Sequence, residues 1–291
     1  MQKNIKVLLI CIITILWGEN VLGQPSPAQK QGILLVSFGT SYPEARTALH
    51  AIEPAVGQAF PEAQIHWAYT SKIIRKKLAI SGTIIPSPDQ ALADMIDQGY
   101  THIMVQSLHI IPGEEYHYLE TITKAFQEIP KRNVTISLGK PLMFTQNDIL
   151  ETAQNMIQVA PKLKQGEAML WMAHGTGHQS AIYYPALQYL LSRQSPHHYL
   201  ATVEFEPALD SVVAQLKAAK VKTIYLQPFM SIAGDHALND MAGDEPDSWK
   251  KQLEAAGFKV ECILKGLTHY DIFVNQWINH MKTVNNENDE Q

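Results

Sequence analysis

The sequence is poor in cysteine and has no strong excess of either charge. Only two of its 291 residues are cysteines, and one of them, Cys11, lies in an N-terminal apolar run. If that run is removed after export, only Cys262 remains, so no intramolecular disulfide can form and the core must stabilise the fold. The net charge of −5 leaves no basic surface to neutralise phosphates, which argues against nucleic acid as a partner.

Long apolar runs are absent beyond the N-terminus. Residues 7–17 form an unbroken apolar segment after Lys3 and Lys6, and this segment is too short to span a bilayer comfortably. Val21 and Gly23 fit the −3 and −1 positions of a cleavage site. We therefore expect a signal peptide over 1–23, a linker over 24–31 and a periplasmic mature protein with no membrane span. An uncleaved N-terminal anchor is the alternative.

Several common catalytic motifs are also missing. The sequence has no Gly-x-Ser-x-Gly, no Gly-x-x-x-x-Gly-Lys-Ser/Thr, no Gly-x-Gly-x-x-Gly and no His-Glu-x-x-His. These absences argue against an α/β-hydrolase, a P-loop nucleotidase, a dinucleotide enzyme and a zincin protease. Twelve histidines are present instead, and imidazole suits divalent ions such as zinc, cobalt, nickel and iron.

Short β-branched runs alternate with amphipathic stretches, which is typical of an α/β protein with a mainly parallel sheet. Strands are predicted at 32–37, 64–69, 102–107, 134–138, 168–173, 199–204, 223–227 and 259–264. Helices are predicted at 43–58, 88–98, 114–128, 147–159, 181–193, 208–219, 247–256 and 269–283.

The chain also repeats itself. Residues 32–40 parallel 168–176, and 101–113 parallel 222–234. This predicts two similar four-stranded lobes over 32–142 and 143–285 with a cleft between them, followed by a polar tail over 286–291. In the repeat Phe38 corresponds to His174 and Glu115 to His236. Chance similarity between buried strands is the alternative, because such strands use few residue types.

Three side chains in the second half fall at predicted strand ends. His174 follows one strand and begins His-Gly-Thr-Gly-His, Glu204 ends the next, and His236 follows the third in a loop rich in Gly, Asp and Asn. In open α/β sheets ligands lie beyond the carboxyl ends of strands. Two imidazoles and one carboxylate would make an open site for a divalent ion. Each histidine taken alone would more often be structural.

Two neighbouring segments complete the predicted site. The acidic residues around His236 could orient its imidazole, whereas Asp244 is expected to cap the helix at 247–256. In the first half, Phe38, Gly39, Thr40 and Ser41 form a turn before a predicted helix. That turn could bind a substrate carboxylate, although helix capping explains it equally well.

At this point the residues resemble a known family, the anaerobic sirohydrochlorin cobaltochelatases of the CbiK type. The resemblance runs from about residue 32 to 280. Its motifs are 33–42 (ILLVSFGTSY), 69–75 (YTSKIIR), 106–116 (QSLHIIPGEEY), 174–178 (HGTGH), 203–204 and 233–249 (AGDHALNDMAGDEPDSW).

The resemblance implies a class II chelatase fold and insertion of Co²⁺ into sirohydrochlorin on the anaerobic route to cobalamin. It implies that His174 is catalytic and that His174, Glu204 and His236 bind the metal. Fe²⁺ and Ni²⁺ remain alternatives to Co²⁺. The sequence departs from the family pattern at Ala173, at Phe205 with Glu206, and at Thr268 with His269. These departures bear on the identity of the tetrapyrrole and not on the type of reaction.

The resemblance leaves further properties open. Some exported relatives hold haem at a subunit interface, so a homo-oligomer is possible and His109 is a candidate haem ligand. The export signal also suits an exported haem- or metal-binding protein that uses the cleft without catalysing insertion. A third alternative is iron insertion into, or removal from, porphyrin in a haem-uptake system.

Overall fold

The structure is a computed structural model that describes residues 29–130 and 132–289. The predicted signal peptide over 1–23 lies outside these residues, as does most of the predicted linker. Gln31, which was placed in that linker, is already the first residue of the first strand. In the described part of the chain, no helix has both the length and the apolar character needed to cross a membrane.

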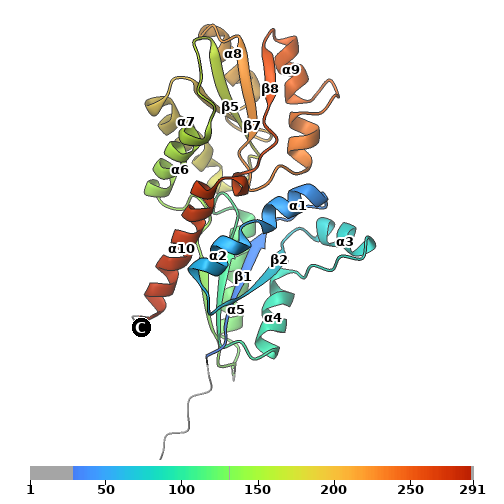
Figure 1. Ribbon diagram of the computed structural model, residues 1–291, viewed down its shortest axis with the longest axis vertical. Coiled ribbons are helices and arrows are strands. Elements are labelled where there is room, and N and C mark those ends of the chain that lie inside the picture. The colour runs from blue at the N-terminus through green and yellow to red at the C-terminus, as the bar shows by residue number, and fades with distance from the viewer. Residues whose placement is uncertain (1–28, 131, 290–291) are drawn as a thin grey trace, which may run out of the picture.

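Two four-stranded parallel sheets form two lobes, which lie one above the other in Figure 1. The first sheet has the order β2-β1-β3-β4 and the second has β6-β5-β7-β8. The strands are β1 Gln31–Ser37, β2 Gln64–Tyr69, β3 His102–Ser107, β4 Thr135–Gly139, β5 Glu167–Ala173, β6 His198–Thr202, β7 Thr223–Pro228 and β8 Lys259–Cys262. The predicted α/β fold with two similar lobes is confirmed.

The repeat extends to individual polar contacts. Gln106 of β3 and Gln227 of β7 are both fully buried, and each pairs in register with the central strand of its sheet. Gln106 Nε2 donates to the carbonyl oxygen of Lys140 at 2.9 Å, and Gln227 Nε2 donates to that of Lys265 at 3.1 Å. In each lobe a buried amide therefore ties the third strand to the chain that leaves the fourth.

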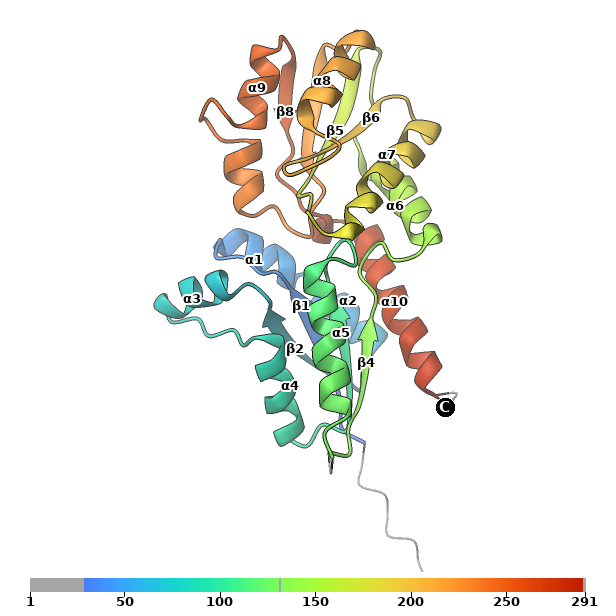
Figure 2. The same ribbon diagram turned by 180° about the vertical axis from the view of Figure 1, so that it is seen from behind.

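Helices cover both faces of each sheet (Figures 1 and 2). They are α1 Pro43–His50, α2 Glu53–Ala59, α3 Lys72–Ile80, α4 Pro88–Asp97, α5 Glu114–Gln127, α6 Gln146–Val159, α7 Tyr183–Gln194, α8 Leu209–Ala218, α9 Trp249–Ala255 and α10 Asp271–Asp289. Short turns are η1 Gln179–Ile182, the π-helical η2 Ala237–Met241, and η3 Leu267–His269.

Two helix predictions were wrong. The single helix expected over 43–58 is two helices, because Pro54 lies in the first turn of α2 and cannot donate the hydrogen bond that a continuous helix needs. Helix α3 was not predicted, although Ser71 caps it by accepting a hydrogen bond from the Ile74 N–H at 3.3 Å.

The C-terminal helix α10 leaves the second lobe and packs against β3, β4 and α2 of the first. It runs down the side of the first lobe in Figure 1. Phe273, Trp277 and Met281 are fully buried on its inner face. The lobe predicted over 143–285 is therefore not continuous in space, and α10 extends to Asp289, into the segment predicted as a polar tail.

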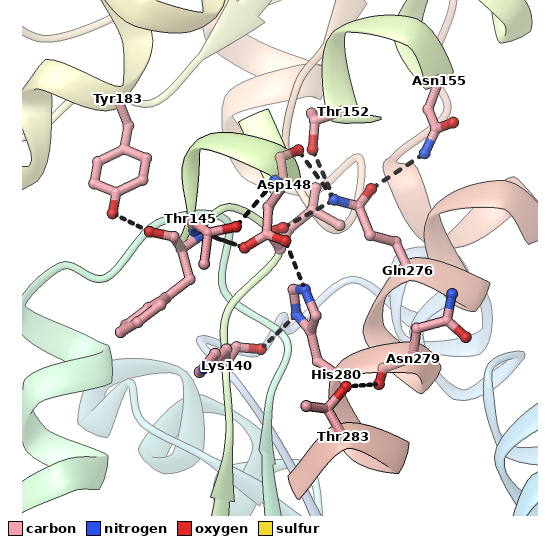
Figure 3. A network of polar contacts seen from close by, with 12 residues as sticks. Lys140, Thr145, Asp148, Thr152, Asn155, Tyr183, Gln276, Asn279, His280 and Thr283 are labelled. Atoms are coloured by element: carbon pink, nitrogen blue, oxygen red, sulfur yellow. Dashed lines mark hydrogen bonds and ion pairs between the residues drawn. The ribbon is translucent and has the colours of Figure 1, made fainter. Parts of the chain in front are cut away.

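A buried polar network fixes α10 to the connection between the lobes (Figure 3). Asp148 of α6 accepts a hydrogen bond from the Thr145 N–H at 2.7 Å, and its other oxygen lies 3.3 Å from His280 Nε2. Gln276 Nε2 donates to the Leu142 carbonyl oxygen at 3.0 Å. Burial raises the pKa of the Asp148 carboxyl, but hydrogen bonds from His280 and Thr145 outweigh it and bring the pKa down to about 2.

The carboxyl edges of the two sheets face each other. The loop after β7 contacts the loop after β3, where Ser231 Oγ donates to the Leu108 carbonyl oxygen. The rings of His117 on α5 and His178 after β5 meet edge to face, with centroids 4.9 Å apart. The strand ends that were predicted to carry the site therefore lie between the lobes.

Candidate active site

The structure brings His174 and His236 into contact. Their imidazole rings lie edge to face with centroids 4.7 Å apart and an angle of 83° between the ring planes. His174 directly follows β5, and His236 ends the loop after β7 at the start of η2. Because β5 and β7 are neighbours in the sheet, adjacent strands deliver the two rings to one place.

Hydrogen bonds define which nitrogen of each ring is free. His174 Nδ1 lies 2.8 Å from the Gly175 carbonyl oxygen, and a carbonyl can only accept, so this nitrogen must carry the proton. His236 Nδ1 is bonded to a carboxylate oxygen of Asp240. In its neutral form each ring would therefore keep the lone pair on Nε2, which is the arrangement found in metal-binding histidines whose other nitrogen donates to the protein.

Glu204 lies beside this pair through its backbone. Strand β6 ends at Thr202, so Glu204 lies past the strand and not at its last residue, as had been predicted. Its N–H donates to the His174 carbonyl oxygen at 2.9 Å. A β-carbon on Gly175 would come within 1.9 Å of the Glu204 carbonyl oxygen. The chain can pass this closely only because Gly175 has no side chain and adopts φ 84°.

The side chain of Glu204 is exposed and does not join the histidines. Across residues 29–130 and 132–289, no three His, Cys, Asp or Glu side chains are grouped so that they could hold an ion. The structure therefore brings together two of the three predicted ligands. The third is held next to them by its main chain, with its carboxylate free in solvent.

The turn predicted over 38–41 contacts the loop that carries His236. Thr40 is buried, and its Oγ1 accepts a hydrogen bond from the Tyr42 N–H at 3.1 Å. A β-carbon on Gly234 would lie 3.5 Å from the same oxygen, so Thr40 lies against the loop that carries His236. Tyr42 OH donates to Asp235, and Asn239 donates to Tyr42 OH at 3.2 Å. The bond to Asp235 raises the pKa of Tyr42.

The other predicted substrate residues lie on the first lobe with at least part of their surface exposed or in tight turns. Phe38 is half exposed, and Gly39 adopts φ 94°, where a β-carbon would collide with the Tyr69 ring. Ser41 and Glu115 are partly exposed, with Glu115 in the first turn of α5. Helix capping does not explain the turn, because α1 has no side-chain cap at its N-terminus.

His109, the predicted haem ligand, has one ring nitrogen bonded to the protein and one without a partner among the described residues. Its Nδ1 lies 2.9 Å from Ser107 Oγ, and its Nε2 is buried without a hydrogen-bond partner. Burial lowers the pKa of this imidazole to about 4, so it is neutral at pH 7. Its role as a haem ligand stays a prediction.

The acidic side chains of the loop after β7 have two different roles. Asp240 orients His236, as expected, and Asp235 binds Tyr42. Asp244 does not cap α9, contrary to prediction: Ser248 is the cap, with its Oγ accepting a hydrogen bond from the Lys251 N–H at 3.3 Å. Tyr42 was missed from the sequence, where its only signal was its position next to the turn 38–41.

Comparison with known proteins identifies the family. Residues 31–286 match the family model described as cobalt chelatase (CbiK). The chain belongs to the cobalt chelatase (CbiK) family. It is 35% identical over 269 residues to the sirohydrochlorin cobaltochelatase CbiKC of Nitratidesulfovibrio vulgaris, covering 91% of this chain and 95% of that protein. It is 37% identical over 240 residues to the sirohydrochlorin cobaltochelatase of Salmonella typhimurium, covering 82% and 90%.

Solved structures support the fold of this cobalt chelatase family member. SirB from Bacillus subtilis with Fe³⁺ has a TM-score of 0.61 at 17% identity, covering 90% of this chain and 98% of that one. CbiX, described as the terminal enzyme of siroheme biosynthesis in denitrifying bacteria, has a TM-score of 0.55 at 15% identity, covering 87% and 99%. At these identities the likeness shows a shared fold.

Proposed function

We propose that this chain inserts Co²⁺ into sirohydrochlorin in cobalamin biosynthesis. The family match supports this, as do two relatives named sirohydrochlorin cobaltochelatase. The observation that carries it is the pair formed by His174 and His236, whose Nε2 atoms are free at the junction of the lobes. Two imidazoles leave further coordination positions on a divalent ion for water and pyrrole nitrogen.

The same geometry suits the proton transfer that insertion requires. When a divalent ion enters the macrocycle, two pyrrole N–H protons must leave. As the ion passes from an imidazole Nε2 to a ring nitrogen, that Nε2 regains its lone pair and can accept a proton. We assign this step to His174, with His236 holding the ion and the solvent-facing carboxylate of Glu204 carrying protons away.

The test is Co²⁺ insertion by the protein that begins at Gln24, followed by the change in sirohydrochlorin absorbance. Wild type should exceed the spontaneous rate, and His174→Ala should reduce insertion to that rate while leaving the fold intact. His197→Ala is the matched control, because this histidine is exposed at the far, amino-terminal end of β6. Tetrapyrrole binding by wild type without acceleration would instead indicate a binding or transfer protein.

Two further properties of the protein are the metal ion that it inserts and the compartment in which it works. The side chains described here do not choose among Co²⁺, Fe²⁺ and Ni²⁺, because availability decides as much as ligand type, so the assay is repeated with each ion. We propose Co²⁺ and a periplasmic protein whose residues 1–23 are removed on export. Cell fractionation with mass measurement of the mature N-terminus tests the location, and a cytoplasmic protein that begins at Met1 would contradict it.

A further inference from the structure

Phe205 is an exposed aromatic residue held in an unfavourable backbone conformation next to the active site. Its side chain is 62% exposed, and its φ is 66°, a left-handed value that is uncommon for any residue other than glycine. Exposure of a phenyl ring gains nothing from the hydrophobic effect, and the backbone conformation is costly. A position with both features is a candidate for a functional constraint.

The surrounding chain fixes the place of this ring. Thr202 Oγ1 donates to the Phe205 carbonyl oxygen at 3.1 Å. The ring lies over Gly177, where a β-carbon would be 3.0 Å from Phe205 Cζ. Gly177 belongs to the segment from His174 to His178, and Phe205 directly follows Glu204, whose N–H is bonded to the His174 carbonyl oxygen. The ring is therefore held over the same loop that carries the catalytic histidine.

A second exposed aromatic ring follows the corresponding strand of the first lobe. Phe38, the repeat equivalent of His174, is a half-exposed ring at the strand end of the opposite lobe. Aromatic rings pack on other π-systems with offset or edge contacts, and such pairs contribute beyond the area they bury. A tetrapyrrole is the flat π-system that the proposed reaction brings to this place.

We propose that Phe205 is a substrate-positioning residue whose ring packs against the macrocycle and sets its depth beside His174. This inference rests on the proposed function, because that function supplies the substrate. The ring takes no part in proton or metal transfer. Its removal should therefore weaken binding of metal-free sirohydrochlorin and leave the rate at saturation nearly unchanged.

The experiment separates the ring from the backbone strain. Phe205→Ala removes the ring and keeps a β-carbon at φ 66°, whereas Phe205→Gly removes both, and Phe205→Tyr keeps the ring. Tyr189→Ala on α7 is the control, because Tyr189 is 63% exposed, nearly the same as Phe205. For each variant we measure the Kd of sirohydrochlorin by ultrafiltration without metal, the kcat and KM of Co²⁺ insertion, and the thermal midpoint.

Both Phe205→Ala and Phe205→Gly should raise the Kd and KM by roughly 2- to 12-fold, the range expected for one aromatic contact. Their kcat should stay within about twofold of wild type. Phe205→Tyr and Tyr189→Ala should match wild type, and Phe205→Gly should have the higher midpoint of the two truncations, because glycine accepts a positive φ.

An unchanged Kd in both truncations would overturn the inference, as would a failure of Phe205→Tyr to restore binding. If wild type binds sirohydrochlorin but does not accelerate Co²⁺ insertion, the proposed function fails and the Kd series still decides the role of Phe205. If wild type does not bind the macrocycle at all, both proposals are wrong.

Discussion

A carboxylate oxygen of Asp240 is hydrogen-bonded to Nδ1 of His236, so the two side chains form one unit on the π-helical segment η2. The carboxylate fixes the tautomer that leaves Nε2 free and makes the imidazole a stronger electron donor. The pair is partly open to solvent, with His236 39% and Asp240 46% exposed.

Asp240→Asn should therefore weaken Co²⁺ binding by about 10- to 100-fold, the usual loss when the partner of a metal-binding histidine is replaced. Calorimetric titration of the metal-free wild type and variant with Co²⁺ measures this affinity. Asp244→Asn is the control, because Asp244 is 95% exposed and its carboxylate lies 4.0 Å from the Lys251 ammonium. Equal affinities for the two variants would contradict the role given to Asp240.

The close passage between Gly175 and Glu204 predicts a large effect of one methyl group. Gly175→Ala places a β-carbon 1.9 Å from a backbone oxygen, so the two active-site segments must separate. We expect lower stability by about 2 kcal/mol or more and loss of insertion. Gly257→Ala is the matched control, since Gly257 also has a positive φ of 96° but nothing within 4 Å of the new carbon. Thermal unfolding of both variants isolates the collision from the backbone effect.

The Asp148 network predicts a pH-dependent contribution to stability. Because the folded-state pKa of about 2 lies below the ordinary 3.8, the ionised carboxylate stabilises the fold at pH above 3.8. This contribution is lost as the pH falls through 2. The shift corresponds to about 2 kcal/mol.

Asp148→Asn should therefore lower the free energy of unfolding by about 2 kcal/mol at pH 7, and its difference from wild type should shrink below pH 3.8. Urea unfolding between pH 2 and pH 7 measures this. Glu151→Gln, an exposed acid on the same helix, should show no such change. A difference that is constant with pH would refute the electrostatic explanation.

The bond between Tyr42 and Asp235 joins the two lobes beside the active site. Tyr42→Phe removes one hydroxyl and keeps the ring, so the lobes should close less often around substrate. We expect kcat/KM for Co²⁺ insertion to fall about 2- to 12-fold, the size of one net hydrogen bond, with little change in the thermal midpoint. Tyr189→Phe should be neutral, and a neutral Tyr42→Phe would show that this contact does not contribute to closure.

Strand positions and the repeat were predictable from the sequence because parallel strands are buried on both faces and read as apolar runs. Ile33 to Val36 show this, with each side chain at most 1% exposed. Helix α3 was not predicted, because four of its nine residues are cationic. These charges weaken the periodic apolar pattern from which helices were predicted.

The sequence predicted which strand ends carry the site, but it did not predict the contacts that the side chains make there. Adjacent strands bring His174 and His236 together, and the sequence places both after strands. The contact of Tyr42 with Asp235 joins residues 193 positions apart, and no local pattern encodes a meeting between lobes. The direction of the Glu204 side chain depends on a turn after β6 whose shape the sequence does not specify.

The return of α10 to the first lobe means that neither half of the chain is a complete folding unit. A protein ending near residue 265 would leave the inner face of the first lobe without Phe273, Trp277 and Met281, and the second half alone would expose the same three side chains to water. The two similar lobes are therefore joined by a helix that follows the second sheet and packs on the first. The two halves of this chain should therefore fold only when both are present.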